Sequence, residues 1–415
     1  MRRLAMIGML VGGVLFVAGF VQAEPLRIGI VESLSGPQTL VGKQTVTAVQ
    51  FVVEKVNAQG GFNGSLIEIK EYDNQGGTSG AADKVKAAIA DGVQIVVQGA
   101  SSAIASQVTE DIRKHNLRNP GKELIYLNVG AEALVLCGEK CHFHHFRFNP
   151  NADIRVNALA AAMKETGDLG TRVYSINQNY AWGQDMENAI VKFAPLYGYT
   201  VIGKVLHDVN RIQDFSPYVA KIKAANPDSV ITGNWSNDLL LLMKATSEAG
   251  LKVRFGMSVA LDSPGNIANA GETAMGHYLS STFSIEAGGE AGARYAEDFK
   301  KFSGHYPAYF EPVVTHAIQF LAAALKKVNF NKGKINANQI AFALEETSIE
   351  TSNGSISMRK EDHQALIPIV VCKVTHDAKY KLDGTDMGLK PIKVIRGPQA
   401  ISPLQDSCKM QRPNR

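Results

Sequence analysis

Residues 93–108, VQIVVQGASSAIASQV, decide the fold. A short run rich in β-branched residues, 93–97, leads into a glycine turn, and two serines then precede a segment of helix formers. This pattern predicts a strand, a turn and a helix start. Because the open N–H groups of a helix's first turn attract anions, Ser101 and Ser102 mark a candidate seat for a carboxylate or phosphate. Serines at this place also serve simply as helix caps.

The same alternation of predicted strands and helices extends along most of the chain. From Leu26 on, short apolar runs alternate with longer amphipathic segments, and Val46, Val49, Val53 and Val56 recur at helical spacing. After residues 146–155, FRFNPNADIR, the alternation starts again and is long enough for a second sheet. The sequence therefore predicts an α/β chain with two mostly parallel, doubly wound sheets that carry helices on both faces.

Composition is that of a folded two-domain protein with an export signal. The chain has 415 residues, of which 45% are hydrophobic and 20% charged. Arg2 and Arg3 precede an apolar run over residues 4–20, and Val-Gln-Ala at 21–23 resembles a cleavage site. Residues 1–23 are therefore predicted to be a secretory signal peptide, the alternative being a retained membrane anchor, for which the run is short.

The charge and the cysteine content limit which partners and which cysteine redox states we expect. Without Arg2 and Arg3 the 43 basic residues fall to 41, against 39 acidic ones, and no long run of either sign exists, so nucleic acid is not expected as a partner. Export makes disulfides possible, and four cysteines allow three pairings. The preferred pairing is a local Cys137–Cys141 loop, with Cys372–Cys408 holding the C-terminal tail.

Two segments could indicate chemistry other than solute binding, one as a nucleophile elbow and the other as a metal site. Residues 99–103, GASSA, lie where a nucleophile elbow would, but Ala103 replaces the second glycine and no histidine and acid follow in a recognisable order. The segment 137–147, CGEKCHFHHFR, crowds two cysteines and three histidines, yet its cysteine spacing is wider than that of a zinc knuckle and export favours a disulfide. We therefore expect no enzyme activity, no metal site and no cofactor.

Four segments together resemble a known family. They are IGIVESLSGPQTLVGKQTVTAVQFVVEKVNAQGGFNG at 28–64, YDNQ at 72–75, INQNYAWGQ at 176–184 and ITGNW at 231–235. In this order and spacing they resemble the type I periplasmic solute-binding proteins of ATP-driven importers, in the leucine/isoleucine/valine-binding branch. The resemblance covers residues 26–374.

The resemblance implies two α/β lobes that are joined by three crossovers and close on a ligand. The cleft between them is also where the carboxyl ends of parallel strands place a site. The crossovers would fall near 146–150, 277–284 and 354–359, with lobe one at 24–146 plus 280–354, lobe two at 150–278 plus 359–374, and a C-terminal tail at 375–415.

Carried over by position, the resemblance also implies site residues. The carboxylate contacts would come from side chains and backbone of lobe one, and aromatic walls from lobe two. The expected ligand-binding residues are Ser101, Ser102, Val129, Ala131, Tyr180 and Trp235, to which Asp262 is added for the reason that follows.

The sequence departs from the amino-acid binders at two positions. An aromatic residue that covers the ligand aligns with Val41, and the acid that holds the α-ammonium aligns with about Val259. A buried ammonium without a carboxylate partner costs several kcal/mol, so an amino-acid ligand needs a substitute acid, and Asp262 is the candidate. Without it, an aromatic carboxylate would suit the site better. Arg147, in the first crossover, either has a structural role or makes a cationic contact to the ligand.

The prediction is thus a periplasmic substrate-binding component of an ABC importer, binding a carboxylate-bearing apolar solute such as a branched-chain or other hydrophobic amino acid. Import of aromatic carboxylates is one alternative, and a ligand sensor that hands occupancy to a membrane receptor is another. The expected partners are the small-molecule ligand and the permease in the inner membrane, and the protein is expected to be a monomer.

Overall fold

The first sheet is parallel throughout and carries the turn at 99–101. The computed structural model describes residues 24–62, 65–328 and 335–414, so the predicted signal peptide lies outside the described residues. The strand order is β2-β1-β3-β4-β5. These elements are β1 Leu26–Glu32, α1 Thr39–Ala58, β2 Ile67–Asp73, α2 Thr78–Ala90, β3 Ile95–Gln98, α3 Ser102–Arg118, β4 Ile125–Asn128, the 3₁₀ helix η1 Leu134–Cys137 and β5 His145–Arg147. The strand, turn and helix predicted over 93–108 are confirmed as β3 and α3.

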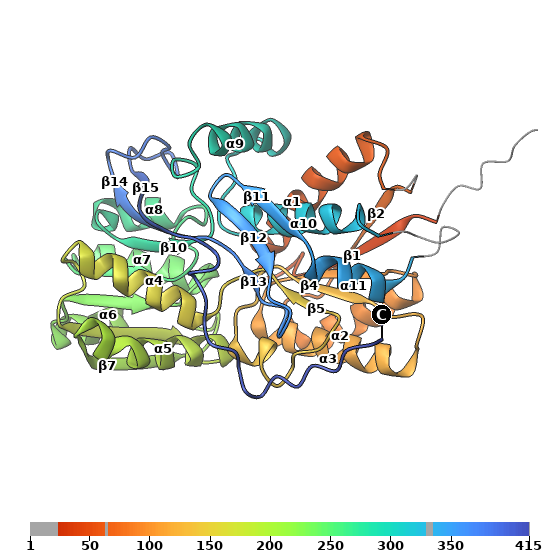
Figure 1. Ribbon diagram of the computed structural model, residues 1–415. Helices are drawn as coiled ribbons and strands as arrows, with labels where there is room; N and C mark the ends of the chain where they lie inside the picture. Colours follow the sequence, from red (N-terminus) through yellow and green to blue (C-terminus); the bar gives the residue numbers. More distant parts are fainter. Residues whose placement is uncertain (1–23, 63–64, 329–334, 415) are drawn as a thin grey trace, which may run out of the picture.

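The second sheet has the order β15-β14-β10-β9-β8-β6-β7 and is parallel except at β14 and β15. Figure 1 shows this half, mainly yellow and green, beside the orange first half. Its elements are α4 Ala152–Glu165, β6 Arg172–Gln178, α5 Ala181–Tyr197, β7 Thr200–His207, α6 Ser216–Ala225, β8 Ser229–Thr232, α7 Ser236–Glu248, β9 Arg254–Met257, α8 Asn266–Ala270, η2 Gly271–Ala274, β10 Tyr278–Ser281, β14 Ile369–Thr375 and β15 Gly388–Ile395. The predicted two-sheet α/β fold is confirmed.

The chain crosses between the two halves three times, after β5, after β10 and after β13. Helix α10 returns to the first half, where it packs on α1. Strand β12 occupies the range predicted for the third crossover and pairs with β11 and β13, so the chain joins the second sheet only afterwards, at β14. The returning elements are α9 Gly289–Ser303, α10 Phe310–Leu325, α11 Ala337–Glu345, β11 Ser348–Thr351, β12 Gly354–Met358 and β13 Ala365–Leu366.

Strand β3 shows why this sequence forms a covered parallel sheet. All four of its residues are buried. Ile95 and Val97 belong to the cluster that includes Val49 of α1, whereas Val96 belongs to a second cluster with Val108 of α3. Successive side chains of a strand point to opposite faces, so helices on both sides require an uninterrupted apolar run rather than an alternating one.

The C-terminal segment 396–414 corrects the disulfide prediction. Cys141 pairs with Cys408, with 5.5 Å between their Cα atoms, while Cys137 and Cys372 are free and buried. The predicted pairs Cys137–Cys141 and Cys372–Cys408 are therefore wrong. The reason lies in the path of the tail, which leaves β15 in the second half and runs across to the first half (Figure 1). Cys141 lies there, between η1 and β5. Cys372 sits within β14, in the interior of the second sheet.

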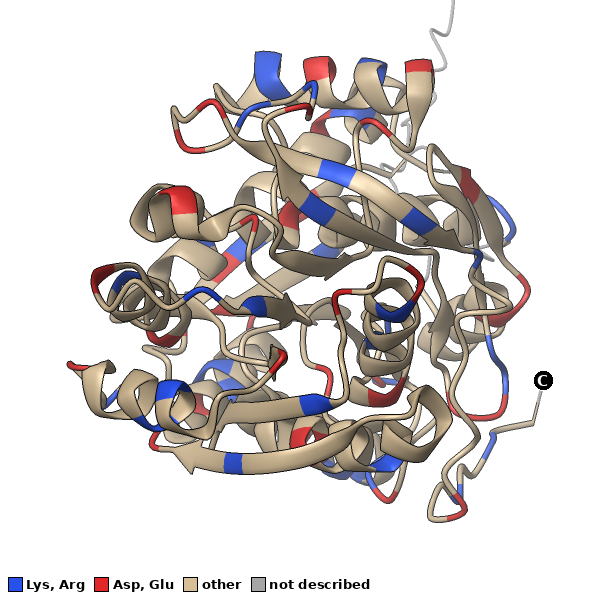
Figure 2. Ribbon diagram, turned by 90° about the vertical axis from the view of Figure 1, so that its left-hand side faces the viewer, with Lys and Arg blue, Asp and Glu red and all other residues tan. Residues whose placement is uncertain are grey.

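Charged residues of both signs are interspersed over the face shown in Figure 2, in keeping with a formal net charge of +4. Over the described ranges, no helix is both long and apolar enough to cross a membrane.

Candidate functional site

The turn between β3 and α3 presents a helix N-terminus. Ser101 is the N-cap of α3 in an extended conformation, and its side chain makes no capping hydrogen bond. The Ser102 hydroxyl oxygen accepts hydrogen bonds from the backbone N–H groups of Glu132 at 3.3 Å and Ala133 at 3.2 Å. Ser102 thereby fixes the loop after β4 beside α3, whereas the hydroxyl of Ser101 and the first-turn amides can receive an anion.

Two glycines allow these loops to approach each other. A Cβ atom on Gly99 would lie 2.8 Å from Gly130 N, and one on Gly130 would lie 2.1 Å from Cε1 of Phe310. The side chain of Phe310, the first residue of α10, thus covers the point where the two turns meet. No other residue type fits at Gly130 without moving this ring.

We predict that Gly130→Ala destabilises the protein by about 1–3 kcal/mol, because the added methyl group has to displace Phe310 or separate the two turns. Urea unfolding followed by circular dichroism measures the change. An unchanged unfolding midpoint would show that the close approach is not required for stability.

A cavity lies between the two halves at this point. It retains about 30 Å³ of free space, room for about two water molecules, so the halves are closed upon each other and a solute needs a wider cleft to enter. Its walls are Gly99, Ala100, Ser101, Ser102, Gly130, Ala131, Glu132, Tyr180, Trp182, Trp235, Val259, Tyr309 and Phe310.

The second half contributes an aromatic wall. Tyr180 and Trp235 are the N-caps of α5 and α7, and the indole N–H of Trp235 donates to the Tyr180 hydroxyl over 2.8 Å. Burial raises the pKa of Tyr180, so its hydroxyl stays protonated. Only 5% of Trp235 is exposed. The two rings hold each other in place and offer apolar faces to a solute, while their polar atoms are already bonded.

The cavity also contains a charge that the sequence prediction missed. The Glu132 carboxylate forms a two-pronged ion pair with Arg155 of α4, with Nε–Oε2 and Nη2–Oε1 distances both of 2.6 Å. Burial raises the pKa of Glu132, although the Arg155 guanidinium acts in the opposite direction. A signal was available, because a glutamate stands between small residues in the loop sequence NVGAEAL. If such a loop is buried, the charge in it needs a partner.

The structure places the other predicted site residues as follows. Ser101, Ser102, Ala131, Tyr180 and Trp235 line the one cavity described above. Val129 stands behind it, fully buried, with its N–H bonded to Gln98 O at 3.1 Å.

Asp262 is held elsewhere. Its carboxylate accepts from the Tyr309 N–H over 3.0 Å and lines two neighbouring cavities rather than this one, and burial raises its pKa. Val259 does line the cavity, whereas Val41 is buried in α1 and does not.

Arg147 is structural in its contacts. Its Nε donates to Gln364 Oε1 at 2.7 Å and its Nη1 to Ala133 O at 2.7 Å. The guanidinium thus ties the first crossover to the loop that precedes η1, and Arg147 is not part of the cavity wall.

Cys141, His142 and His144 of the segment 137–147 have other partners, whereas Cys137 is a free, buried thiol. Cys141 is in the disulfide, His142 Nε2 lies 3.0 Å from the Thr109 hydroxyl, and His144 Nε2 lies 2.7 Å from Asn338 Oδ1. Burial lowers the pKa of His142 to about 3, so this ring is neutral.

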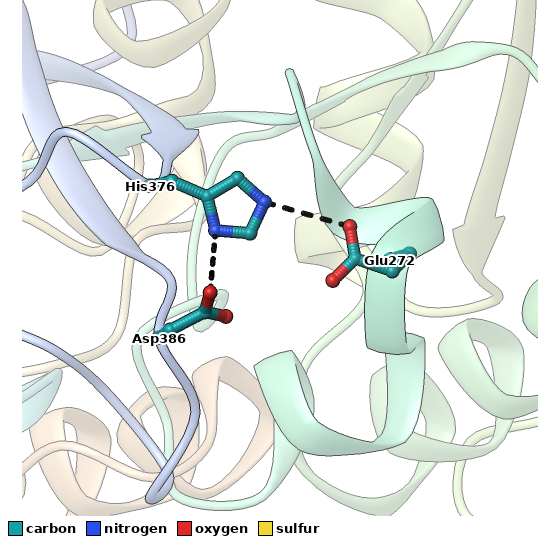
Figure 3. A group of neighbouring side chains, drawn as sticks. All are labelled: Glu272, His376 and Asp386. Carbon is teal, nitrogen blue, oxygen red and sulfur yellow. Dashed lines mark ion pairs between the residues drawn. The ribbon is translucent and has the colours of Figure 1, made fainter.

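A group of possible metal ligands lies on the surface instead (Figure 3). Among the residues described, Glu272, His376 and Asp386 place ligand atoms within 4.8 Å of one another. His376 pairs with both acids, at 3.5 Å to Glu272 and 3.1 Å to Asp386, and all three are exposed. Exposed acidic groups of this kind are common without a bound metal ion.

Comparison with known proteins gives consistent results. The sequence matches the model of the periplasmic binding protein family over residues 25–379. It is 59% identical over 391 residues to Leu/Ile/Val-binding protein homolog 4 of Brucella abortus (strain 2308), covering 94% of each chain. The structure resembles the closed conformation of the leucine-, isoleucine-, valine-, threonine- and alanine-binding protein of Brucella ovis, with a TM-score of 0.90, 58% identity, and coverage of 94% of this chain and 100% of that chain.

A more distant structure shares the fold alone. A solute-binding protein of an ABC transporter from R. palustris, in complex with benzoate, has a TM-score of 0.79 at 17% identity and covers 93% of this chain and 100% of that one.

Proposed function

Because the chain belongs to the periplasmic binding protein family, we propose that it is the substrate-binding component of an ABC importer, with a branched-chain or other hydrophobic amino acid as its solute. One observation carries the proposal. The N-terminus of α3 in the first half and the rings of Tyr180 and Trp235 in the second half line the same cavity. The Brucella abortus relative, named for leucine, isoleucine and valine binding, supports the choice of solute.

Each half has its own part in capture. The amides and hydroxyl at Ser101 receive the carboxylate, since the positive end of the α3 dipole favours an anion. Tyr180 and Trp235 cover the apolar part when the halves approach. The solute contacts both halves only in the closed form, so it shifts the equilibrium toward that form, which the permease then recognises. The protein performs no chemistry in this scheme and needs no cofactor.

The moving units follow from the crossovers. The predicted bounds, lobe one at 24–146 plus 280–354 and lobe two at 150–278 plus 359–374, are proposed with two changes: β10 stays with lobe two, and the third boundary moves to the segment after β13. The pairing of β15 with β14 adds β15 to lobe two. Residues 1–23 direct export to the periplasm, where the protein acts as a monomer.

A second solute class has one observation in its favour. Val259, at the position aligned with the family's ammonium-binding acid, lines the cavity as an apolar side chain. An aromatic carboxylate lacks an amine and would not require that acid. The two classes are separated by calorimetric titration with L-leucine, 4-methylpentanoate and benzoate. If none of the three binds, the proposed function is wrong.

We predict that Trp235→Ala weakens binding of the preferred solute about 10- to 30-fold, because a buried aromatic contact worth about 2 kcal/mol is lost. Isothermal titration calorimetry measures the affinity, and far-ultraviolet circular dichroism confirms folding. Leu196→Ala, which removes an exposed side chain from α5, is the control and should bind as the wild type does. Equal affinities for the two variants would remove Trp235 from the binding wall.

A further inference from the structure

Glu132 is the charged side chain among the thirteen described residues that line the binding cavity. It follows Ala131 in the loop after β4, and its backbone N–H donates to the Ser102 hydroxyl oxygen at 3.3 Å. Glu132 is thus next to the helix N-terminus proposed to hold the ligand carboxylate. In an α-amino acid the ammonium and carboxylate groups are attached to one carbon atom, so an acceptor for the ammonium has to lie beside the anion seat.

Arg155 fixes the position of the Glu132 carboxylate and leaves some of the hydrogen-bond acceptor sites of this carboxylate free. The guanidinium donates one hydrogen bond to each carboxylate oxygen at 2.6 Å. Its Nη1 is bonded to the backbone oxygens of Ser258 and Ser280, so Arg155 is itself anchored in the second half. The side chains of Glu132 and Arg155 are only 6% and 5% exposed. An ionised carboxylate offers about four lone-pair sites, and the guanidinium occupies two of them.

The other acids near the cleft are directed elsewhere. Asp262 accepts from the Tyr309 N–H and is outside the cavity wall. Asp238 accepts from Gln178 Nε2 at 2.6 Å and from the Asn210 N–H at 2.9 Å, and it too is outside the wall. Glu132 is therefore the carboxylate on the described cavity wall that can meet a solute.

We infer that Glu132 accepts hydrogen bonds from the α-ammonium of the solute, with Arg155 as its positioning residue, so that the cleft selects amino acids over the same acids without an amine. This inference rests on the proposed function. An amino-acid zwitterion adds no net charge to the neutral Glu132–Arg155 pair, whereas an acid without an amine brings an uncompensated negative charge into the closed cleft. Glu132 thereby takes the role that the sequence comparison assigned to Asp262.

The test compares two ligands of the same carbon skeleton. Glu132→Gln is expected to weaken L-leucine binding about 30-fold or more and not to weaken 4-methylpentanoate binding, because only leucine loses a charge-assisted hydrogen bond while the remaining Arg155 charge favours an anionic ligand. Isothermal titration calorimetry gives both affinities. If the single variant is too unstable to assay, Glu132→Gln with Arg155→Met removes both buried charges together and carries the same prediction.

The outcomes separate this inference from the proposed function. An equal loss for both ligands would overturn it, because the ion pair would then serve closure alone. A wild-type protein that binds 4-methylpentanoate or benzoate but not leucine would also overturn it, while import of a carboxylate would stand. A wild type that binds none of the three ligands overturns the proposed function itself.

Discussion

Replacing both Cys141 and Cys408 with serine is expected to lower the melting temperature of the protein by about 4–10 °C. The disulfide joins residues that are 267 positions apart in the sequence. A cross-link that closes so long a loop restricts the unfolded chain strongly, and such bonds stabilise by about 2–5 kcal/mol. At about 2 °C per kcal/mol for a large chain, this gives the stated shift. Differential scanning fluorimetry without ligand measures it.

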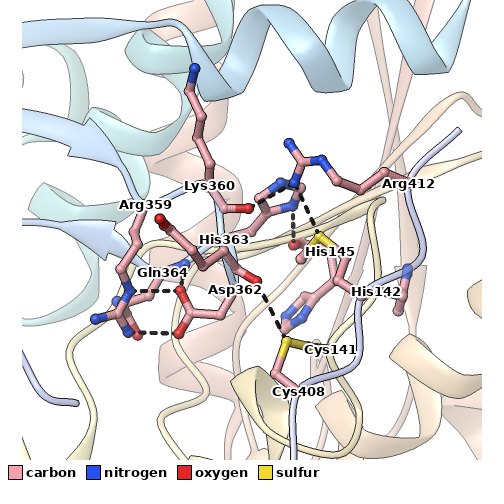
Figure 4. Close-up of a disulfide and its surroundings, with 12 residues drawn as sticks. Cys141, His142, His145, Arg359, Lys360, Asp362, His363, Gln364, Cys408 and Arg412 are labelled. Atoms are coloured by element: carbon pink, nitrogen blue, oxygen red, sulfur yellow. Dashed lines mark hydrogen bonds and ion pairs between the residues drawn. A yellow bond between two sulfur atoms is a disulfide. The ribbon is translucent and has the colours of Figure 1, made fainter. Parts of the chain in front are cut away.

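The position of the disulfide explains why its loss should be felt by the whole molecule. Segment 396–414 starts at the second sheet and is held to the region between the halves by Ser402, which accepts from Arg359 Nη1 at 2.8 Å and from Asn151 Nδ2 at 2.6 Å. Its far end is fixed by the Cys141–Cys408 disulfide (Figure 4) and by the ion pair of Arg412 with Glu345. Without the covalent bond, the segment is held by these polar contacts and by the packing of Ala400 and Met410 on the core.

Cys137→Ala is the matched control, because it removes a buried thiol and leaves the disulfide intact. It should lower the melting temperature less than the double serine variant does. Peptide mapping without reductant should yield a Cys141–Cys408 peptide. A Cys372–Cys408 peptide, or a double variant as stable as the wild type, would contradict this account.

Local sequence patterns were sufficient for the fold and for part of the cavity wall. The run at 93–108 predicts β3 and α3 because the strand, the turn and the helix start are each indicated by residues adjacent in the sequence. Tyr180 and Trp235 were expected from the resemblance to the type I solute-binding proteins, and both line the cavity as the N-caps of α5 and α7. Such positions depend on little beyond the strand that precedes them.

Partners distant in sequence could not be predicted in the same way. The Cys141–Cys408 bond depends on the path of the tail across the molecule, which no local pattern describes. The Glu132–Arg155 pair joins the loop after β4 in the first half to α4 in the second half. Asp262 was chosen because it lies three residues from the aligned position, yet loop geometry directs it to the Tyr309 N–H. Spacing along the chain sets neither a crossing path nor a side-chain direction.

Glu32→Gln is expected to be more stable than the wild type. The difference between their free energies of unfolding is expected to grow by about 3 kcal/mol from pH 5 to pH 8. Glu32 ends β1 and is fully buried. One carboxylate oxygen accepts from the Gly99 N–H at 2.6 Å, and the other has no hydrogen-bond partner. Burial raises the pKa of this carboxyl to about 8, from an ordinary value of 4.5.

The direction of this pH dependence follows from proton binding by Glu32. Between pH 4.5 and pH 8 the folded protein retains a proton that the unfolded chain releases, so this contribution to stability is complete below pH 4.5 and is lost as pH rises through 8. Glutamine keeps the acceptor for Gly99 but cannot ionise, which removes the loss. Urea unfolding at several pH values measures the difference between variant and wild type.

Glu54→Gln, which neutralises an exposed carboxylate on α1, is the control for removing one negative charge. Its stability difference from the wild type should vary with pH much less than that of Glu32→Gln, because an exposed carboxylate is solvated in both the folded and the unfolded chain. The Gly99 turn supports Ser101, so a glutamine that preserves this bond should also preserve solute affinity. A Glu32→Gln difference that stayed constant from pH 5 to pH 8 would mean that the buried carboxylate is already ionised at the lower pH and that the fold tolerates its charge.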